Sequence, residues 1–148
     1  MDAQERAVME QVRRRFAEAR FLEHVGITLE GLGRGWAETA LVVGPQHGQA
    51  QGFVHAGVQA TMADHTAGTA GGTLVGDDQA VLTVEMKLNL LRPAVGKSLR
   101  CRAEVVKAGK SLMFCEAKVH AGGADGEKLV ATFTSTLAVV AAPSGASG

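Results

Sequence analysis

Gln49, His55 and Asp64 are the residues of this chain whose types and spacing suit acid–base chemistry. A carboxylate can act as a general base or as a nucleophile, while an imidazole or an amide can orient a substrate or a water molecule. Asp64 lies inside Gly52–Val75, a stretch rich in alanine, glycine, threonine and valine that contains no lysine or arginine. Burying a charge without a partner is costly, so a carboxylate in such surroundings suggests a functional role.

The stretch around Asp64 predicts one long helix, from about Val54 to Val75 and roughly 30 Å in length. Polar side chains are few in it, so we expect the helix to be buried on nearly all sides. His55-Ala56-Gly57 lies at its N-terminal end. A helix N-terminus presents free N–H groups and a partial positive charge, so the N–H of Ala56 or of Gly57 could stabilise an oxyanion.

Each of these residues also has a plainer interpretation. Asp64 would be an N-cap if a helix began at His65, and His55 could bind only backbone groups. Gln49 could be an ordinary loop residue. Thr83 fits a strand whether or not it also positions an acid or a water molecule.

The histidines do not suggest a metal centre. His47, His55 and His65 lack the HxxxH or CxxC spacing that places ligands on one side of a metal ion, so no metal is expected. His65 follows Asp64 directly, and adjacent residues of a helix point apart. We therefore do not expect His65 to be the partner of Asp64.

Patterns elsewhere predict the elements that surround the long helix. An amphipathic helix over Ala3–Leu22, within residues 1–22, ends at Gly26. Two strands flank a glycine-rich turn before the long helix, and four strands follow it. The predicted strands are Ile27–Leu32, Trp36–Val43, Gln79–Leu91, Leu99–Lys107, Ser111–His120 and Leu129–Val140. Short turns between consecutive strands imply antiparallel pairing, so the fold is predicted to be α+β, with an antiparallel sheet around one central helix.

The first strand after the long helix alternates in polarity along its whole length. The alternation predicts Leu82, Val84, Met86, Leu88 and Leu90 on one face and Thr83, Glu85, Lys87 and Asn89 on the other. The 148 residues fit a single domain, 1–148, in which residues 141–148 form a small, polar tail that we expect to be frayed.

Charge and cysteine content narrow the class of partner and the compartment. Fifteen basic and fifteen acidic residues balance, so no nucleic acid or membrane partner is expected. Acidic residues near the N-terminus argue against a transit peptide, and no export signal is visible. Cys101 and Cys115 are therefore expected to be reduced in a cytoplasmic protein, although strand register leaves open whether they face each other.

The second half of the chain is more basic than the first. Lys87 to Lys128 holds nine basic residues against four acidic ones. This asymmetry suits a small molecule that carries phosphates, although a solvated sheet face explains it equally well.

These motifs in this order resemble the hot-dog fold and, within it, the acyl-CoA thioesterases of the phenylacetate-pathway (PaaI-like) type. That family has a loop Asn or Gln, an HGG at a helix start and an acid within the helix, to which Gln49, His55-Ala56-Gly57 and Asp64 are similar. Thr83-Val84-Glu85, the break at Leu91-Arg92-Pro93 and the basic hairpin Lys107-Ala108-Gly109-Lys110-Ser111 continue the resemblance, which spans Gly26 to Val140. Ala56 departs from the family, because it replaces the first glycine. Its methyl group leaves the N–H intact but bears on substrate size.

The resemblance implies an enzyme that hydrolyses a small or medium acyl-CoA, aromatic acyl groups included, to a free acid and coenzyme A. Asp64 would be the base or nucleophile, and the Ala56 or Gly57 N–H the oxyanion donor. His55 and Gln49 would orient substrate and water, and Thr83 would position the water or the acid. No cofactor is implied, because coenzyme A is part of the substrate. The residues proposed to bind it are Glu85, Leu90, Arg92, Lys107, Gly109, Lys110 and Ser111, with Arg92 and the two lysines at its phosphates.

The distance between His55 and Asp64 raises a geometric problem. Nine residues of helix correspond to about 13 Å of rise, so one chain cannot easily aim both side chains at one carbonyl. The resemblance implies a homodimer or a dimer of dimers, in which His and Gln of one subunit face Asp and Thr of the other.

Two other functions fit the same residues. A hydratase or dehydratase on the same fold also pairs a histidine with an acid on the central helix, and a non-catalytic sensor would bind acyl-CoA without turnover. The sequence leaves open the acyl group, the choice between nucleophile and general base, and the tetramer arrangement.

Overall fold

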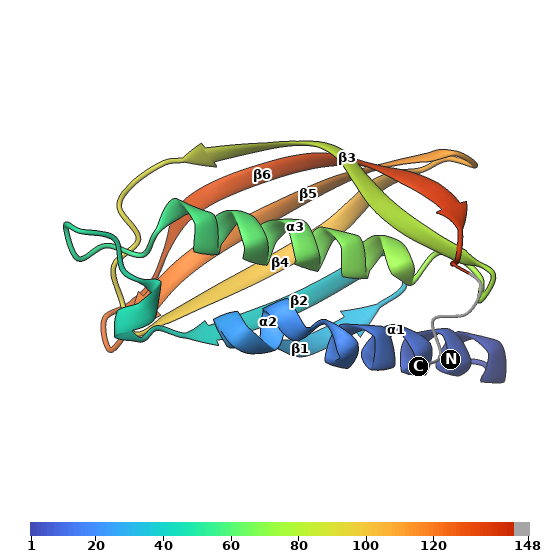
Figure 1. Cartoon of the computed structure of the whole chain (residues 1–148), viewed down its shortest axis with the longest axis horizontal. Helices are drawn as coiled ribbons and strands as arrows, with labels where there is room; N and C mark the ends of the chain where they lie inside the picture. The colour runs from blue at the N-terminus through green and yellow to red at the C-terminus, as the bar shows by residue number, and fades with distance from the viewer. Residues whose placement is uncertain (144–148) are drawn as a thin grey trace.

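The computed structural model describes residues 1–143, which form one antiparallel sheet curled around a helix (Figure 1). The elements are α1 (Ala3–Glu18), α2 (Arg20–Val25), β1 (Ile27–Gly33), β2 (Trp36–Val42), the short 3-10 helix η1 (Pro45–His47), α3 (Ala56–Gly72), β3 (Gln79–Leu90), β4 (Ser98–Ala108), β5 (Leu112–Gly123) and β6 (Gly126–Ala141). The strand order is β1-β2-β4-β5-β6-β3, so β3 forms one edge of the sheet. The predicted α+β fold, with an antiparallel sheet around one central helix, is confirmed.

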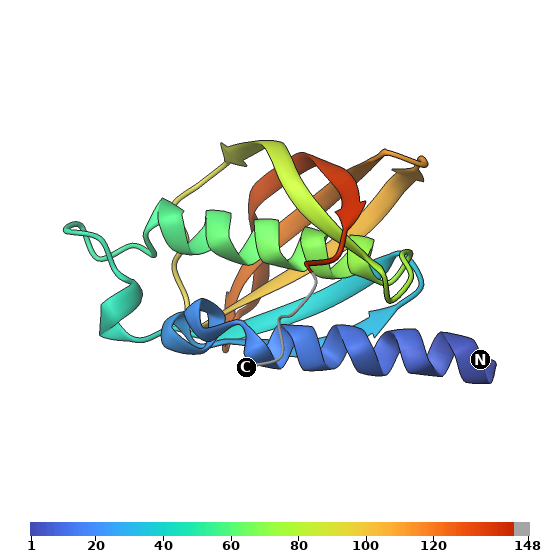
Figure 2. The same ribbon diagram turned by 45° about the vertical axis from the view of Figure 1, so that its right-hand side comes forward.

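The helices lie on one side of the sheet. Figure 2 shows α3 running along the concave face, with α1 alongside it near β1 and β2. No helix among residues 1–143 is both long enough and apolar enough to cross a membrane. Ala141 still belongs to β6, and the rest of the predicted tail from residue 144 onward lies outside the described residues.

The N-terminal helix is shorter than predicted, because the chain breaks at Ala19. A capping box between Asp2 and Glu5 starts α1. Ala19 then takes the non-helical ψ of 86° and separates α1 from α2. Gly26 ends α2 in the left-handed conformation, with φ 93°, as glycine at a helix C-terminus commonly does. The prediction of Gly26 as the stop is therefore confirmed, and the prediction of one continuous helix is wrong.

The central helix is bounded more tightly than the predicted Val54–Val75, because α3 begins at Ala56 and ends at Gly72. His55 is its N-cap and Asp64 lies in the interior of α3, so the alternative of an N-cap at Asp64 is excluded. Ala63, Ala67 and Ala70 are fully buried. Their small side chains let the sheet approach the helix closely.

Strand β3 shows a β-bulge that the alternating pattern does not reveal. Its register with β6 shifts between Thr83, which pairs with Leu137, and Glu85, which pairs with Thr136. A bulge inserts one extra residue, so the residues beyond it change faces. Thr83 and Met86 thus share the inner face, since their partners Leu137 and Ser135 are both buried. The prediction that Leu82, Val84, Met86, Leu88 and Leu90 share one face is therefore wrong at the bulge.

The two cysteines are separate, buried thiols. Cys101 pairs with Val119 and Cys115 with Val105, so they are not opposite each other. Burial raises the pKa of Cys101 to about 12 and that of Cys115 to about 11. Neither thiol is suited to act as a nucleophile, because nucleophilic attack requires the thiolate.

The close contact between α3 and β6 gives a test of the fold. A Cβ atom at Gly71 would lie 2.6 Å from Cδ1 of Leu137, whose side chain is fully buried. We expect Gly71→Val to lower the free energy of unfolding by about 2 kcal/mol through overpacking, measured by urea denaturation. Gly123→Val is the control, because a Cβ there would meet nothing within 4 Å. Equal stability of the two variants would contradict this packing.

Candidate active site

Asp64 and Thr83 form the polar contact between α3 and β3. The Thr83 hydroxyl donates to Oδ1 of Asp64 at 2.7 Å. Asp64 is half-buried, and Thr83 lies on an exposed part of the strand. The structure therefore brings together two residues that the sequence singled out separately, and it leaves Oδ2 of the carboxylate without a hydrogen bond to any described residue.

His55 caps the N-terminus of α3 with its own ring. Nδ1 of His55 accepts from the Gly57 N–H at 2.8 Å. In a neutral imidazole the proton then lies on Nε2, which is left as a donor. His55 therefore does bind a backbone N–H, as the plainer interpretation holds, but this contact uses only one of its two ring nitrogens.

The capping contact leaves only one of the two predicted oxyanion donors free. The Gly57 N–H is occupied by His55, whereas the Ala56 N–H has no acceptor among the described residues. The free N–H at the positive end of α3 is therefore that of Ala56.

Gln49 lies in the loop before α3 and is held within that loop. Its side-chain Nε2 donates to Oε1 of Gln51 at 2.7 Å, and its Oε1 accepts from the Gln51 N–H. Gln49, His55 and Ala56 line one cavity of about 580 Å³, here called the tip cavity, together with Leu90 and Arg92. Five of the predicted site residues therefore lie around one space.

Asp64 and Thr83 line a different cavity, of about 810 Å³, here called the acid cavity. Its walls come from α1, α3 and the first half of β3, and no residue lines both cavities. One chain thus keeps its acid and its free helix N-terminus apart, as the spacing of His55 and Asp64 predicts.

The other proposed coenzyme A residues divide between the two ends of the sheet. Arg92 and Leu90 lie at the tip cavity. Lys107, Gly109, Lys110 and Ser111 lie at the exposed β4–β5 turn, where the Gly109 N–H donates to the Leu112 carbonyl at 2.8 Å. Leu112 pairs with Ala138 of β6, which pairs with Leu82, so this turn is level with the Thr83 end of β3.

Glu85 lies on the outer face of the sheet rather than beside a cavity. It accepts from the Thr136 hydroxyl at 2.6 Å. Because the bulge turns Glu85 outward, it is placed away from both Asp64 and the tip of α3.

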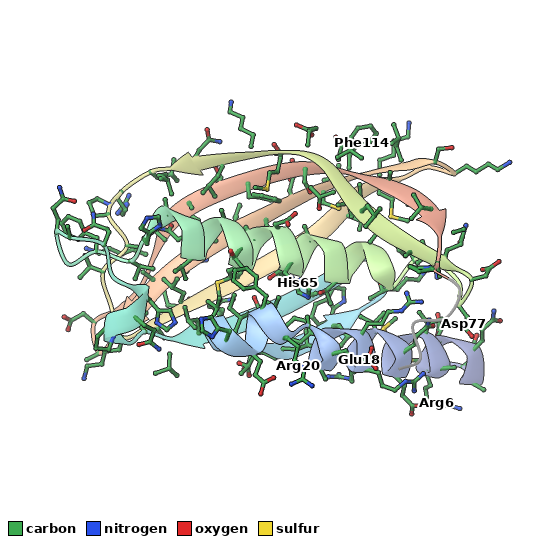
Figure 3. The ribbon with its side chains drawn as sticks, in the orientation of Figure 1. Arg6, Glu18, Arg20, His65, Asp77 and Phe114 are labelled. Carbon is green, nitrogen blue, oxygen red and sulfur yellow. The ribbon has the colours of Figure 1, made fainter. Side chains whose placement is uncertain are left out.

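His65 lies between α3 and α1, as Figure 3 shows. Its ring meets that of Phe16 edge to face, with centroids 5.1 Å apart. Burial lowers the pKa of His65 below 6.5, and the charge of Asp64 offsets only part of this effect. His65 makes no side-chain hydrogen bond to Asp64, as predicted for adjacent helical residues.

His47 has a structural role. It is 3% exposed, and its Nδ1 accepts from the Gly44 N–H while its Nε2 donates to the Val25 carbonyl. Both ring nitrogens are therefore used within the protein.

Gln59 is a site residue that sequence reasoning missed. It lines the tip cavity, is 3% exposed, and its Oε1 has no hydrogen-bond partner among the described residues. Buried acceptors are almost always paired, so this oxygen is suited to a donor from a bound molecule. In the sequence, Gln59 stands out only as a single amide among the small residues of α3. Its functional role cannot be inferred until the position of the cavity is known.

Comparisons with known proteins show what this chain is similar to. The model of the thioesterase superfamily matches residues 51–127. A crystal structure of a thioesterase family protein from Silicibacter pomeroyi is similar at 35% identity and a TM-score of 0.89, over 91% of this chain and 99% of that one. A variant of the phenylacetic acid degradation protein PaaI from Thermus thermophilus is similar at 26% identity and a TM-score of 0.71, over 80% of this chain and 97% of that one.

A curated relative is also a CoA thioester hydrolase. The 1,4-dihydroxy-2-naphthoyl-CoA hydrolase of Listeria monocytogenes is 28% identical over 117 residues, which cover 79% of this chain and 93% of the relative. The PaaI-like resemblance read from the sequence is confirmed.

The buried imidazole of His65 gives a pH test. The unfolded chain keeps a His pKa near 6.5, whereas the folded value is lower, so the unfolded state binds more protons between the two. The free energy of unfolding therefore rises with pH in that window, and stability is lost as pH falls through 6.5 towards the folded pKa. We expect His65→Gln to flatten this slope in urea denaturation series, whereas the exposed His24→Gln should keep it. Identical slopes in both variants would contradict the prediction.

Proposed function

The chain belongs to the thioesterase superfamily and is a thioester hydrolase, and from this premise we propose that it hydrolyses acyl-CoA to a free acid and coenzyme A. The observation that carries the proposal is the Asp64 carboxylate, held at one oxygen by Thr83 and facing an open cavity with the other oxygen available. We infer a small or medium acyl group, aromatic groups included. The names of the relatives, a naphthoyl-CoA hydrolase and a phenylacetic acid degradation protein, support this range.

The edge strand β3 supports a homodimer as the active unit. Leu82, Val84 and Met86 are 59%, 58% and 49% exposed, and an exposed apolar edge strand favours pairing with another strand. Two copies of β3 running antiparallel about a two-fold axis at Lys87, with the bulged Val84 left out of the pairing, would set Thr83 of one copy opposite Leu90 of the other. The acid cavity of each copy would then adjoin the tip cavity of its partner.

Such a dimer completes the reaction site. The thioester carbonyl would accept from the Ala56 N–H, and a single preorganised donor of this kind is worth about 3 kcal/mol of barrier. Nε2 of His55 and the side chain of Gln49 would orient the substrate. The orphan Oε1 of Gln59 would accept from the attacking water or from an amide N–H of the pantetheine arm.

Asp64 of the second copy would supply the base. As general base it takes a proton from water while the water oxygen bonds to the carbonyl carbon; the C–S bond then breaks, and the proton is returned to the departing thiolate. As nucleophile it would first bond to the carbonyl carbon and displace the coenzyme A thiolate, and water would then cleave the resulting anhydride to the free acid and Asp64, its proton passing to the thiolate. Both routes need the ionised carboxylate, and Thr83 holds its orientation in either one.

The same symmetry would gather the basic residues. Within one copy, Arg92 lies at the opposite end of the sheet from Lys107 and Lys110. Antiparallel pairing of two β3 strands would bring Arg92 of one copy close to these lysines of the other. We propose that the coenzyme A phosphates bind there. The proposal includes a cytoplasmic location. It requires no cofactor, because coenzyme A is part of the substrate.

The role of the acid gives the first functional test. We expect Asp64→Asn to lower kcat for acyl-CoA hydrolysis by at least about 10³-fold, because the amide can neither accept the proton nor attack. Thr83→Val should lower kcat by about 10-fold through lost orientation of the carboxylate. Thiol release measures both, and exposed Thr28→Val is the control. Thioester cleavage that survives in Asp64→Asn, or enoyl-CoA hydration that exceeds cleavage in the unaltered protein, would contradict the proposal.

Sharing of the site between two copies gives a second test. Homodimers of Asp64→Asn and of His55→Ala should each be nearly inactive. In a mixed dimer one site would carry both changes and the other neither, so co-expression of the two differently tagged chains, followed by tandem purification, should restore up to about half of the activity. A site contained within one chain would predict no recovery, because each chain would keep its own defect.

A further inference from the structure

The acid cavity extends well beyond the carboxylate that would react. Its volume of about 810 Å³ lies within the range of cavities that bind small molecules. Asp64 and Thr83 lie at its β3 side, and from there it continues along α3 beneath α1. The space is therefore continuous with the reacting group and large enough for the part of a substrate that follows the carbonyl.

Gly68 forms the floor of this space one helical turn beyond Asp64, on the same side of α3. Glycine destabilises a helix interior relative to alanine, so a glycine there usually serves packing. Packing does not require the glycine at position 68, because a Cβ there would meet no described atom of another element within 4 Å. Gly71, three residues later, shows the opposite case, with Leu137 in the way.

Part of the facing wall is aromatic and apolar, although Arg15 and Glu18 of α1 and Asp77 also line the cavity. Phe16 of α1 and His65 of α3 line the cavity with their rings in edge-to-face contact at 5.1 Å. Val81 of β3 adds aliphatic surface. Because burial lowers the pKa of His65, its ring is mainly uncharged at neutral pH and suits contact with an apolar group.

We propose that the acyl group of the substrate lies in the acid cavity, over Gly68 and against Phe16, and that the missing side chain at Gly68 admits medium-length and aromatic acyl groups. This inference rests on the proposed function and deepens it. A side chain at position 68 would occupy the space that the acyl group needs, whereas acetyl groups, which end near Asp64, would still fit.

The test is a series of Gly68 variants assayed against acyl-CoA esters from acetyl to decanoyl, with benzoyl-CoA and phenylacetyl-CoA. Gly68→Leu should lower kcat/KM for octanoyl-CoA and phenylacetyl-CoA by roughly 10–200-fold, the range expected when a pocket loses room, and should change that for acetyl-CoA less than about threefold. Gly68→Ala should shift the profile less. It should also raise the melting temperature by about 2–4 °C, because alanine favours the helix and meets no neighbour.

Gly123→Leu is the matched control. It adds the same side chain at a hairpin position that is equally open, and it should leave the acyl-length profile unchanged. An unchanged profile in Gly68→Leu, or an equal loss for every substrate while the dimer persists, would overturn the inference. If Gly68→Leu fails to fold, the profile of Gly68→Ala decides, since an unchanged profile there would overturn the inference in the same way. Absence of hydrolysis of any ester by the unaltered protein would instead refute the proposed function.

Discussion

The β-bulge at Val84 is the constraint on which the candidate site depends. A regular strand that placed Thr83 against α3 would turn Met86, Leu88 and Leu90 away from it. The extra residue lets both sets face the helix, because the register with β6 shifts by one between Thr83 and Glu85. One strand can thus hold the acid at one end through a hydroxyl group and line the tip cavity at the other end with an aliphatic side chain.

The central helix supplies both kinds of group that ester hydrolysis needs, but at different points along its length. Its free N–H at Ala56 lies at the positive end, and Asp64 lies two turns on. Small side chains between them let the sheet close tightly over the helix. This packing keeps the Asp64 carboxylate and the free Ala56 N–H in separate cavities within one chain, which is why the proposed reaction draws on a second copy.

Much of this could be predicted from the sequence, because it depends on local patterns. The bland composition of residues 52–75 predicts a buried helix, and the order Gln49, His55, Asp64 places the candidate residues before, at and within it. The break at Ala19 escaped prediction, because alanine is a good helix former and only the change of direction of the chain requires its non-helical ψ.

Other features depend on tertiary contacts that no local pattern encodes. The bulge at Val84 leaves the alternation of the sequence intact and shows only in the pairing with β6. That Gly57 is occupied while Ala56 is free follows from the rotamer of His55. Gln59 and Gly68 gain meaning only from the cavities that they line, since an amide or a glycine in a helix has many other uses.

The two edges of the sheet differ, and this difference limits how far the chain can assemble through its strands. At one edge β3 is long, with exposed apolar side chains. At the other, β1 has seven residues, a register shift between Leu29 and Gly31, and packing against α1 and α2. Short, irregular and covered edges resist strand addition. The proposed pairing through β3 would be self-limiting, because a two-fold pairing uses the same exposed strand edge on both partners and leaves only the covered β1 edge among the described strands. In the proposed dimer these two edges would favour a closed pair over an open-ended fibre, and the pairing would cover exposed aliphatic side chains of β3 that otherwise invite aggregation.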